Sequence, residues 1–128
     1  MRAHSVFRNA AEVFPQMTAD SAAVRSADLS PLKDAGELDL IRKLSAFPVV
    51  VEGAARAHEP HRLAFYLYDL ASAFHTQWTK GNESPHLRFI QATDGTLTAA
   101  RLALILATQR VLATGLALLG VQAPQEMR

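Results

Sequence analysis

The stretch Thr96–Val121, TLTAARLALILATQRVLATGLALLGV, decides the fold of this chain. It contains no proline and no glycine before Gly115, and Leu, Ile, Val or Ala fill most of its positions. Apolar residues recur every seven positions and form a broad stripe at helical period, at Leu97, Leu104, Val111 and Leu118. Because a helix that is apolar on most sides usually lies at the centre of its domain, we predict a central helix here.

A membrane-spanning helix is the alternative interpretation of this stretch. Arg101, Gln109 and Arg110 interrupt it, and burying these groups in lipid is costly. The N-terminus, Met-Arg-Ala-His, also lacks the apolar region of a signal peptide. We therefore predict a soluble intracellular protein whose core contains this helix.

The composition is that of one globular domain. The chain has 128 residues, 13 basic and 12 acidic side chains, a formal net charge of +1 and no cysteine. Disulfides and thiolate metal sites are therefore excluded, and the charge alone does not indicate a nucleic-acid-binding protein. We expect a single domain over residues 1–128, with a first helix at 1–15, a linker or short helical turns at 16–36, and the main bundle at 37–128.

Helical periodicity dominates the main bundle. We expect helices over residues 37–47, 49–59, 61–80 and 96–121. Pro48 separates the first two, Gly81–Asn82 has the pattern of a helix C-cap, and Gly120 ends the last helix. Val49–Val51 could form a strand, but no partner strand is evident. The predicted fold class is all-α, a bundle of about five helices.

No catalytic or metal-binding motif is present. The histidines share no ligand spacing and are expected on the surface, at His4, His58, His61, His75 and His86. No serine lies in a nucleophile elbow, Asp69 stands alone, and no glycine-rich phosphate loop occurs. We therefore predict no catalytic residue, no metal and no cofactor for this chain.

Phe74 and Trp78 lie one helical turn apart and admit two interpretations. They could complete the apolar core stripe that begins at Leu63. They could instead stack on unpaired bases, with phosphates held by the neighbouring cations Lys80, Arg62, Arg56 and His75.

Two long segments resemble a known family. HRLAFYLYDLASAFHTQW (61–78) and AARLALILATQRVLATGLALLGVQAPQEM (99–127) are similar to the C-terminal anticodon-binding, or DALR, domain of class I arginyl-tRNA synthetases. The most specific part is L-A-x-G-L-x-L-L-G-V-x-A-P-x-x-M, at Leu112–Met127. RKLSAFP (42–48) and HSVFRNA (4–10) extend the resemblance to nearly all of the chain outside the linker.

Two departures qualify this resemblance. The tetrapeptide that names the domain is Thr98-Ala99-Ala100-Arg101 in this chain, which keeps one alanine and the arginine. HIGH-like and KMSK-like motifs are absent, so the adenylating domain is missing and the chain is expected to be a fragment. The resemblance implies that a full enzyme would charge arginine onto its tRNA with ATP and magnesium, whereas this piece would be inactive alone.

The resemblance also implies site residues and partners. Phe74 and Met127 match positions that approach the anticodon loop, Trp78 lies one turn further on, and Arg101 is expected to pair inside the bundle. Phenylalanine at position 74 allows stacking but no hydroxyl hydrogen bond. Positive charge on the first helix is local, at Arg2, His4 and Arg8.

The expected partners are the anticodon stem-loop of arginine tRNA and the catalytic domain of the parent synthetase. We further expect a cytoplasmic monomer that does not contact membranes. The alternative hypothesis is a helical protein-interaction module without catalysis.

Overall fold

The computed structural model describes residues 8, 10, 12, 14 and 22–120. These contain the helices α2 (Ala22–Arg25), α3 (Ala35–Ser45), α4 (Phe47–Ala57), α5 (Pro60–Glu83) and α6 (Gly95–Gly120), and the 3₁₀ helix η1 (Pro85–Leu87). Arg8, Ala10 and Glu12 are also helical, within the predicted first helix. No strand occurs among the described residues, and the predicted all-α class is confirmed.

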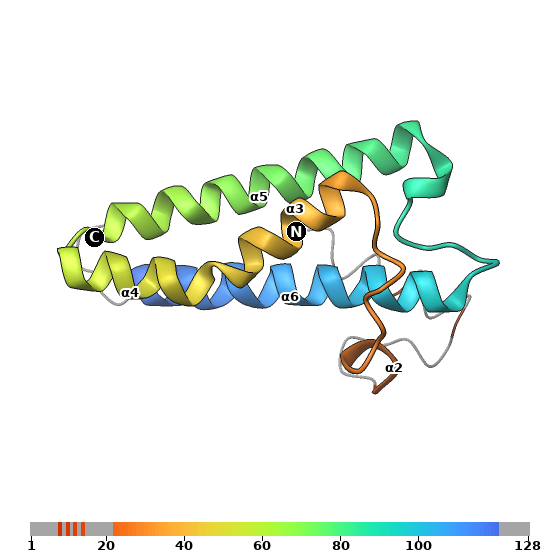
Figure 1. Ribbon diagram of the computed structural model, residues 1–128, viewed down its shortest axis with the longest axis horizontal. Coiled ribbons are helices and arrows are strands. Elements are labelled where there is room, and N and C mark those ends of the chain that lie inside the picture. Colours follow the sequence, from red (N-terminus) through yellow and green to blue (C-terminus); the bar gives the residue numbers. More distant parts are fainter. Residues whose placement is uncertain (1–7, 9, 11, 13, 15–21, 121–128) are drawn as a thin grey trace.

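Helices α5 and α6 form a long antiparallel pair (Figure 1). Helices α3 and α4 follow one another along the front of this pair, and α2 lies beside the first half of α6 (Figure 1). Helix α5 packs against α3, α4 and α6, so it contributes to the core along most of its length.

The break between α3 and α4 lies at Ala46, slightly before the predicted break at Phe47–Pro48. Pro48 occupies the first turn of α4, where the missing N–H needs no partner. Val49–Val51 belongs to that helix and not to a strand. Helix α3, however, begins at Ala35, two residues before the predicted start, because Asp34 and Glu37 form a capping box.

The predicted end of α5 at Gly81–Asn82 is wrong, since the helix continues to Glu83. Gly81 is helical, and it lies directly against the end of η1 and Arg88. A Cβ atom at this position would lie 3.1 Å from the carbonyl oxygen of Leu87 and 3.2 Å from Cα of Arg88. Glycine is therefore needed here for close backbone approach, not for a left-handed cap.

The buried apolar residues form two clusters of unequal size. The larger lies among α2, α3, α5, the first half of α6 and Phe89 of the α5–α6 connection. The smaller joins Ala54 of α4 to Leu63 and Leu67 of α5. Side chains from α4 and the second half of α6 pack around it.

Burial along α6 departs from the predicted stripe. Leu104 and Ile105 are buried as expected, but Leu102, predicted to lie off the stripe, is buried as well. Leu118, predicted to lie on the stripe, is exposed. By length and composition α6 could cross a membrane. However, the first half of α6 is buried and Arg101 forms a buried ion pair, and both features are typical of a core helix.

Candidate nucleic-acid interface

Three aromatic side chains stack where α5 meets the connection to α6. The ring of Phe89 lies 5.7 Å from that of Phe74 and 5.6 Å from that of Trp78, centroid to centroid. The interplanar angles are 24° and 27°, so Phe89 stacks on both rings. This aromatic stack holds the connection against α5.

The predicted site residues differ in exposure. Phe74 is 8% exposed and belongs to the core cluster, whereas Trp78 is half-buried and lies at its edge. Met127 lies outside the described residues. In the described structure Trp78 is therefore more accessible to a ligand than Phe74.

Phe89 was missed by the sequence analysis. It lies in a polar connection without helical or strand periodicity, so no pattern marks it. The only sequence signal is the apolar pair Phe89–Ile90 within that polar stretch.

Arg101 fastens the connection to the bundle. Its Nε donates to Oε2 of Glu37 at 2.8 Å, and its Nη1 donates to the carbonyl oxygens of His86 and Arg88 at 2.9 and 2.7 Å. Arg101 is 4% exposed and Glu37 is 1% exposed. The predicted pairing of Arg101 with a neighbouring helix is confirmed, and the same side chain positions the backbone on either side of Leu87.

A second polar cluster joins the start of α3 to α5. Asp34 Oδ2 accepts from Lys80 Nζ at 2.7 Å, from Gln77 Nε2 at 3.1 Å and from the Gly36 N–H at 3.0 Å. The hydrogen bond from Lys80 holds the pKa of the Asp34 carboxyl below its ordinary value, with smaller contributions from Gln77 and Gly36. The end of α5 that carries Trp78 is thus tied to α3.

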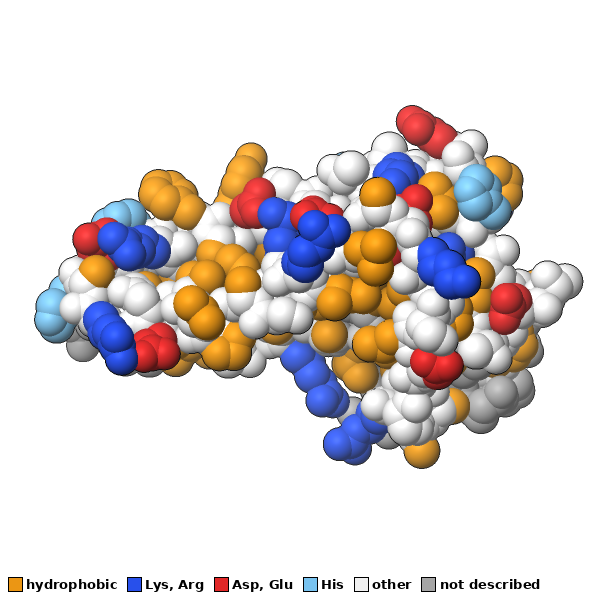
Figure 2. All heavy atoms as spheres, in the orientation of Figure 1, with side chains coloured by type: hydrophobic (Ala, Val, Ile, Leu, Met, Phe, Trp, Pro, Cys, Tyr) orange, Lys and Arg blue, Asp and Glu red, His pale blue; other side chains and the backbone are white. Residues whose placement is uncertain are grey.

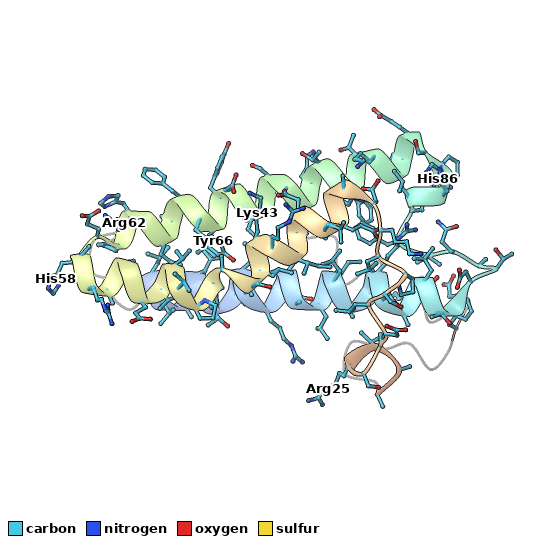
Figure 3. All side chains as sticks on the ribbon, in the orientation of Figure 1. Arg25, Lys43, His58, Arg62, Tyr66 and His86 are labelled. Carbon is cyan, nitrogen blue, oxygen red and sulfur yellow. The ribbon has the colours of Figure 1, made fainter. Side chains whose placement is uncertain are left out.

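Two of the cations expected near the aromatic stack lie elsewhere. Arg62 lies where α4 meets α5, at the opposite end of the molecule from His86 (Figure 3). Arg62 pairs with Glu59 at 2.7 Å and Arg56 with Glu52 at 2.6 Å. On the face shown in Figure 2, basic and acidic side chains lie close together at that end. The expectation that Arg62 and Arg56 neighbour Trp78 is wrong, because α5 runs the full length of the bundle.

The described histidines are exposed, at His58, His61, His75 and His86. Within the part of the chain that the structure describes, no three potential metal ligands of the His, Cys, Asp and Glu types lie together. His4 lies outside that part.

A groove runs between α5 and the second half of α6. This α5–α6 groove has a volume of about 600 Å³ and is lined by Ala64, Leu67, Tyr68, Ala71, Gln109, Leu112, Ala113, Leu116 and Leu119. No charged side chain lines it, and its surface is almost entirely apolar. Its volume lies within the range of small-ligand sites.

Comparison with known proteins identifies the family. Residues 1–127 match the DALR anticodon binding domain family. The chain is 56% identical to an arginine–tRNA ligase of Rhodopseudomonas palustris (strain HaA2) over 131 residues, and 57% identical to one of Nitrobacter winogradskyi over 131 residues. An arginine–tRNA ligase of Beijerinckia indica is 57% identical over 127 residues.

Each of these alignments covers 99% of this chain and 22% of the relative. The chain thus spans about a fifth of the length of the relatives that it matches. No solved structure gives a significant match. The family match extends over all the described helices, and the chain belongs to the DALR anticodon-binding domain family.

Proposed function

We propose that this chain is the anticodon-binding domain of an arginine–tRNA ligase and holds the anticodon stem-loop of arginine tRNA. The observation that carries the proposal is the family match over residues 1–127. Relatives named arginine–tRNA ligase, more than half identical over 99% of the chain, support the choice of amino acid.

The chemistry of aminoacylation belongs, in this proposal, to a catalytic domain of a longer protein. That domain would bind ATP and magnesium and join arginine to the tRNA, and this chain would need no cofactor. The parent would act as a monomer in the cytoplasm. The role of this chain is then to bind and orient the RNA, which raises the effective concentration of the acceptor end at a distant active site.

Phe74, Trp78 and Met127 are the proposed RNA contacts. Trp78 is half-buried, and a base that stacked on it would continue the order Phe74–Phe89–Trp78. Phe74 is covered by Phe89, so a base could reach it only if the connection after η1 moved. Phe74 therefore supports the stack, and direct contact with RNA is assigned first to Trp78.

The competing function is that of a protein-interaction module. Exposed apolar side chains on α5 and α6 are compatible with it. The family match favours RNA binding, because the family is defined by anticodon recognition.

A fluorescence titration tests the proposal, because Trp78 is the single tryptophan of the chain. The chain is titrated with arginine tRNA and with the same tRNA carrying an altered anticodon, at several salt concentrations. We expect the Trp78 emission to change at lower concentrations of the native RNA, and the affinity to fall as salt rises.

Equal affinity for the two RNAs would contradict anticodon recognition. No measurable binding to either RNA, by fluorescence or by filter retention at low salt, would contradict RNA binding by this domain. Saturable binding of a protein ligand with indifference to RNA would favour the interaction module.

A further inference from the structure

We infer that the cleft between α2 and α6 is an anion site that binds the phosphate backbone of the RNA through Arg25 and Arg110. The inference rests on the proposed function and supplies phosphate contacts that the aromatic stack lacks. The α2–α6 cleft has a volume of about 260 Å³ and is lined by Val24, Arg25, Ala103, Leu106, Ala107 and Arg110.

The cations close to the aromatic stack are already engaged. Phosphate contacts supply a large share of the affinity for a nucleic acid, whereas contacts to the bases supply specificity. Lys80 lies near Trp78 along α5, but its Nζ is bonded to Asp34 at 2.7 Å. The Nε of Arg88 donates to the carbonyl oxygen of Gly81 at 3.3 Å. Phosphate contacts are therefore expected on another part of the surface.

Packing holds both arginines at the rim of the α2–α6 cleft. Val24 of α2 is fully buried in the core, so Arg25, the next residue, is held at the surface beside α6. Figure 3 shows Arg25 projecting from α2 along the lower side of α6. Arg110 is exposed on α6, and the small side chains of Ala103 and Ala107 leave room between the two helices.

The charge of the cleft favours an anion. None of the described side chains that line it is acidic, and Arg25 forms no ion pair with a carboxylate of the described residues. Basic side chains project there beside α2 with no acidic side chain next to them (Figure 2). At the other end of the bundle, by contrast, Arg56 and Arg62 pair with Glu52 and Glu59. Two guanidinium groups on an otherwise uncharged cleft suit phosphate oxygens, which guanidinium groups bind with two parallel hydrogen bonds.

The cleft lies at the same level of the bundle as the aromatic stack. Gly115 of α6 faces Leu67 of the antiparallel helix α5. Trp78 follows Leu67 by eleven residues, or about 16 Å of helix, which brings it level with the part of α6 that begins near Leu104. The cleft extends along α6 from residue 103 to residue 110. An RNA that stacks a base on Trp78 can therefore pass its backbone around α6 to the cleft.

The test removes charge at the cleft and, as a control, the same charge elsewhere. The chain is titrated with arginine tRNA at several salt concentrations, and the slope of log K against log salt is measured. The test variant is Arg25→Gln/Arg110→Gln. The control variant is Arg56→Gln/Arg62→Gln, which loses the same charge from two exposed ion pairs. Because all four side chains are exposed, both variants should keep the circular dichroism spectrum of the unmodified chain.

We expect the test variant to reduce the magnitude of the slope by about 0.7 or more, which is the contribution of one phosphate contact. Its affinity at about 0.1 M salt should fall by about fivefold or more. The loss should be equal for a tRNA with an altered anticodon, because a phosphate contact carries no sequence information. Arg25→Lys/Arg110→Lys should retain most of the slope, because lysine keeps the charge. The control variant should keep the slope and stay within about twofold in affinity.

Two results would overturn the inference while leaving the proposed function intact. The first is the same salt slope for the test and control variants. The second is a loss of affinity that occurs only with the native anticodon, because that pattern belongs to base recognition. If the glutamine variant does not fold, Arg25→Gln against Arg56→Gln makes the same comparison with one charge. If the unmodified chain binds neither RNA, the proposed function fails and the inference fails with it.

Discussion

The two halves of α6 have similar apolar sequences and different surroundings. Between Gly95 and Thr108, helices α2, α3 and α5 enclose the helix, and residues on all its sides are buried. Between Gln109 and Gly120, α5 is the main neighbour and α4 packs chiefly on α5. Leu116 is 61% exposed there, and Leu118 is also exposed. The burial of a leucine is thus decided by the neighbouring elements and not by the local composition.

The polar groups differ in the same way. The ion pair of Arg101 with Glu37 is buried in the enclosed half, where a charge without a partner is costly. The pair of Arg56 with Glu52, at the end of the bundle that contains α4, is exposed on both sides. We therefore expect substitutions in the enclosed half to affect stability, and those in the open half to affect mainly binding.

The largest expected effect is that of Phe74→Ala. Removing a buried phenylalanine that stacks on Phe89 should lower the free energy of unfolding by about 3–5 kcal/mol. Leu116→Ala in the open half is the control and should change it by less than about 1 kcal/mol. Urea denaturation followed by circular dichroism measures both. A small loss for Phe74→Ala, together with weakened RNA binding, would make Phe74 a direct RNA contact.

Glu37→Ala should lower the free energy of unfolding by about 3 kcal/mol, because it leaves the Arg101 guanidinium buried without its carboxylate partner. Glu52→Ala, which breaks the exposed pair, should cost less than about 1 kcal/mol. If urea denaturation showed similar losses of unfolding free energy for the two variants, burial would not explain a difference between the two ion pairs.

Two helical glycines differ in the space beside them: Gly115 lies in close packing, and Gly53 lies in the open. A methyl group on Gly115 would lie 2.5 Å from Cδ2 and 3.1 Å from Cγ of Leu67, whereas one on Gly53 meets nothing within 4 Å. Gly115→Ala should therefore destabilise the fold by about 1–2 kcal/mol, since overpacking exceeds the gain in helix propensity. Gly53→Ala should stabilise it by about 0.5–1 kcal/mol. Thermal unfolding of both variants checks the opposite signs.

The smallest expected effect is a pH dependence that arises at Asp34. Because the hydrogen bond from Lys80 lowers the pKa of this carboxyl, its contribution to stability is present above the unfolded-state value of about 3.9. The contribution is lost as the pH falls through the lower pKa of the folded state. Asp34→Asn keeps a capping side chain but does not titrate, so its stability should depend less on pH below about 4.

Local rules predicted the helices well and their ends less well. The early start of α3 could be predicted from Asp34 and Glu37, which have the spacing of a capping box. The end of α5 could not be predicted in this way, because the role of Gly81 depends on the backbone of Leu87 and Arg88, which folds back against it.

The candidate site was predictable only in part. Resemblance indicated Phe74, Trp78 and the pairing of Arg101, but neither Phe89 nor the α5–α6 groove carries a pattern of its own. Phe89 lies in a connection, and the groove draws its residues from two separate helices.

The sequence by itself determined the helical class, a break close to Pro48 and the central position of α6, because periodicity and proline act within a few residues. The tertiary structure alone decided which half of α6 is enclosed, where Phe89 inserts and which face of α5 stays open. These features depend on segments far apart in the chain, whose contacts are set by packing and are not encoded in any local pattern.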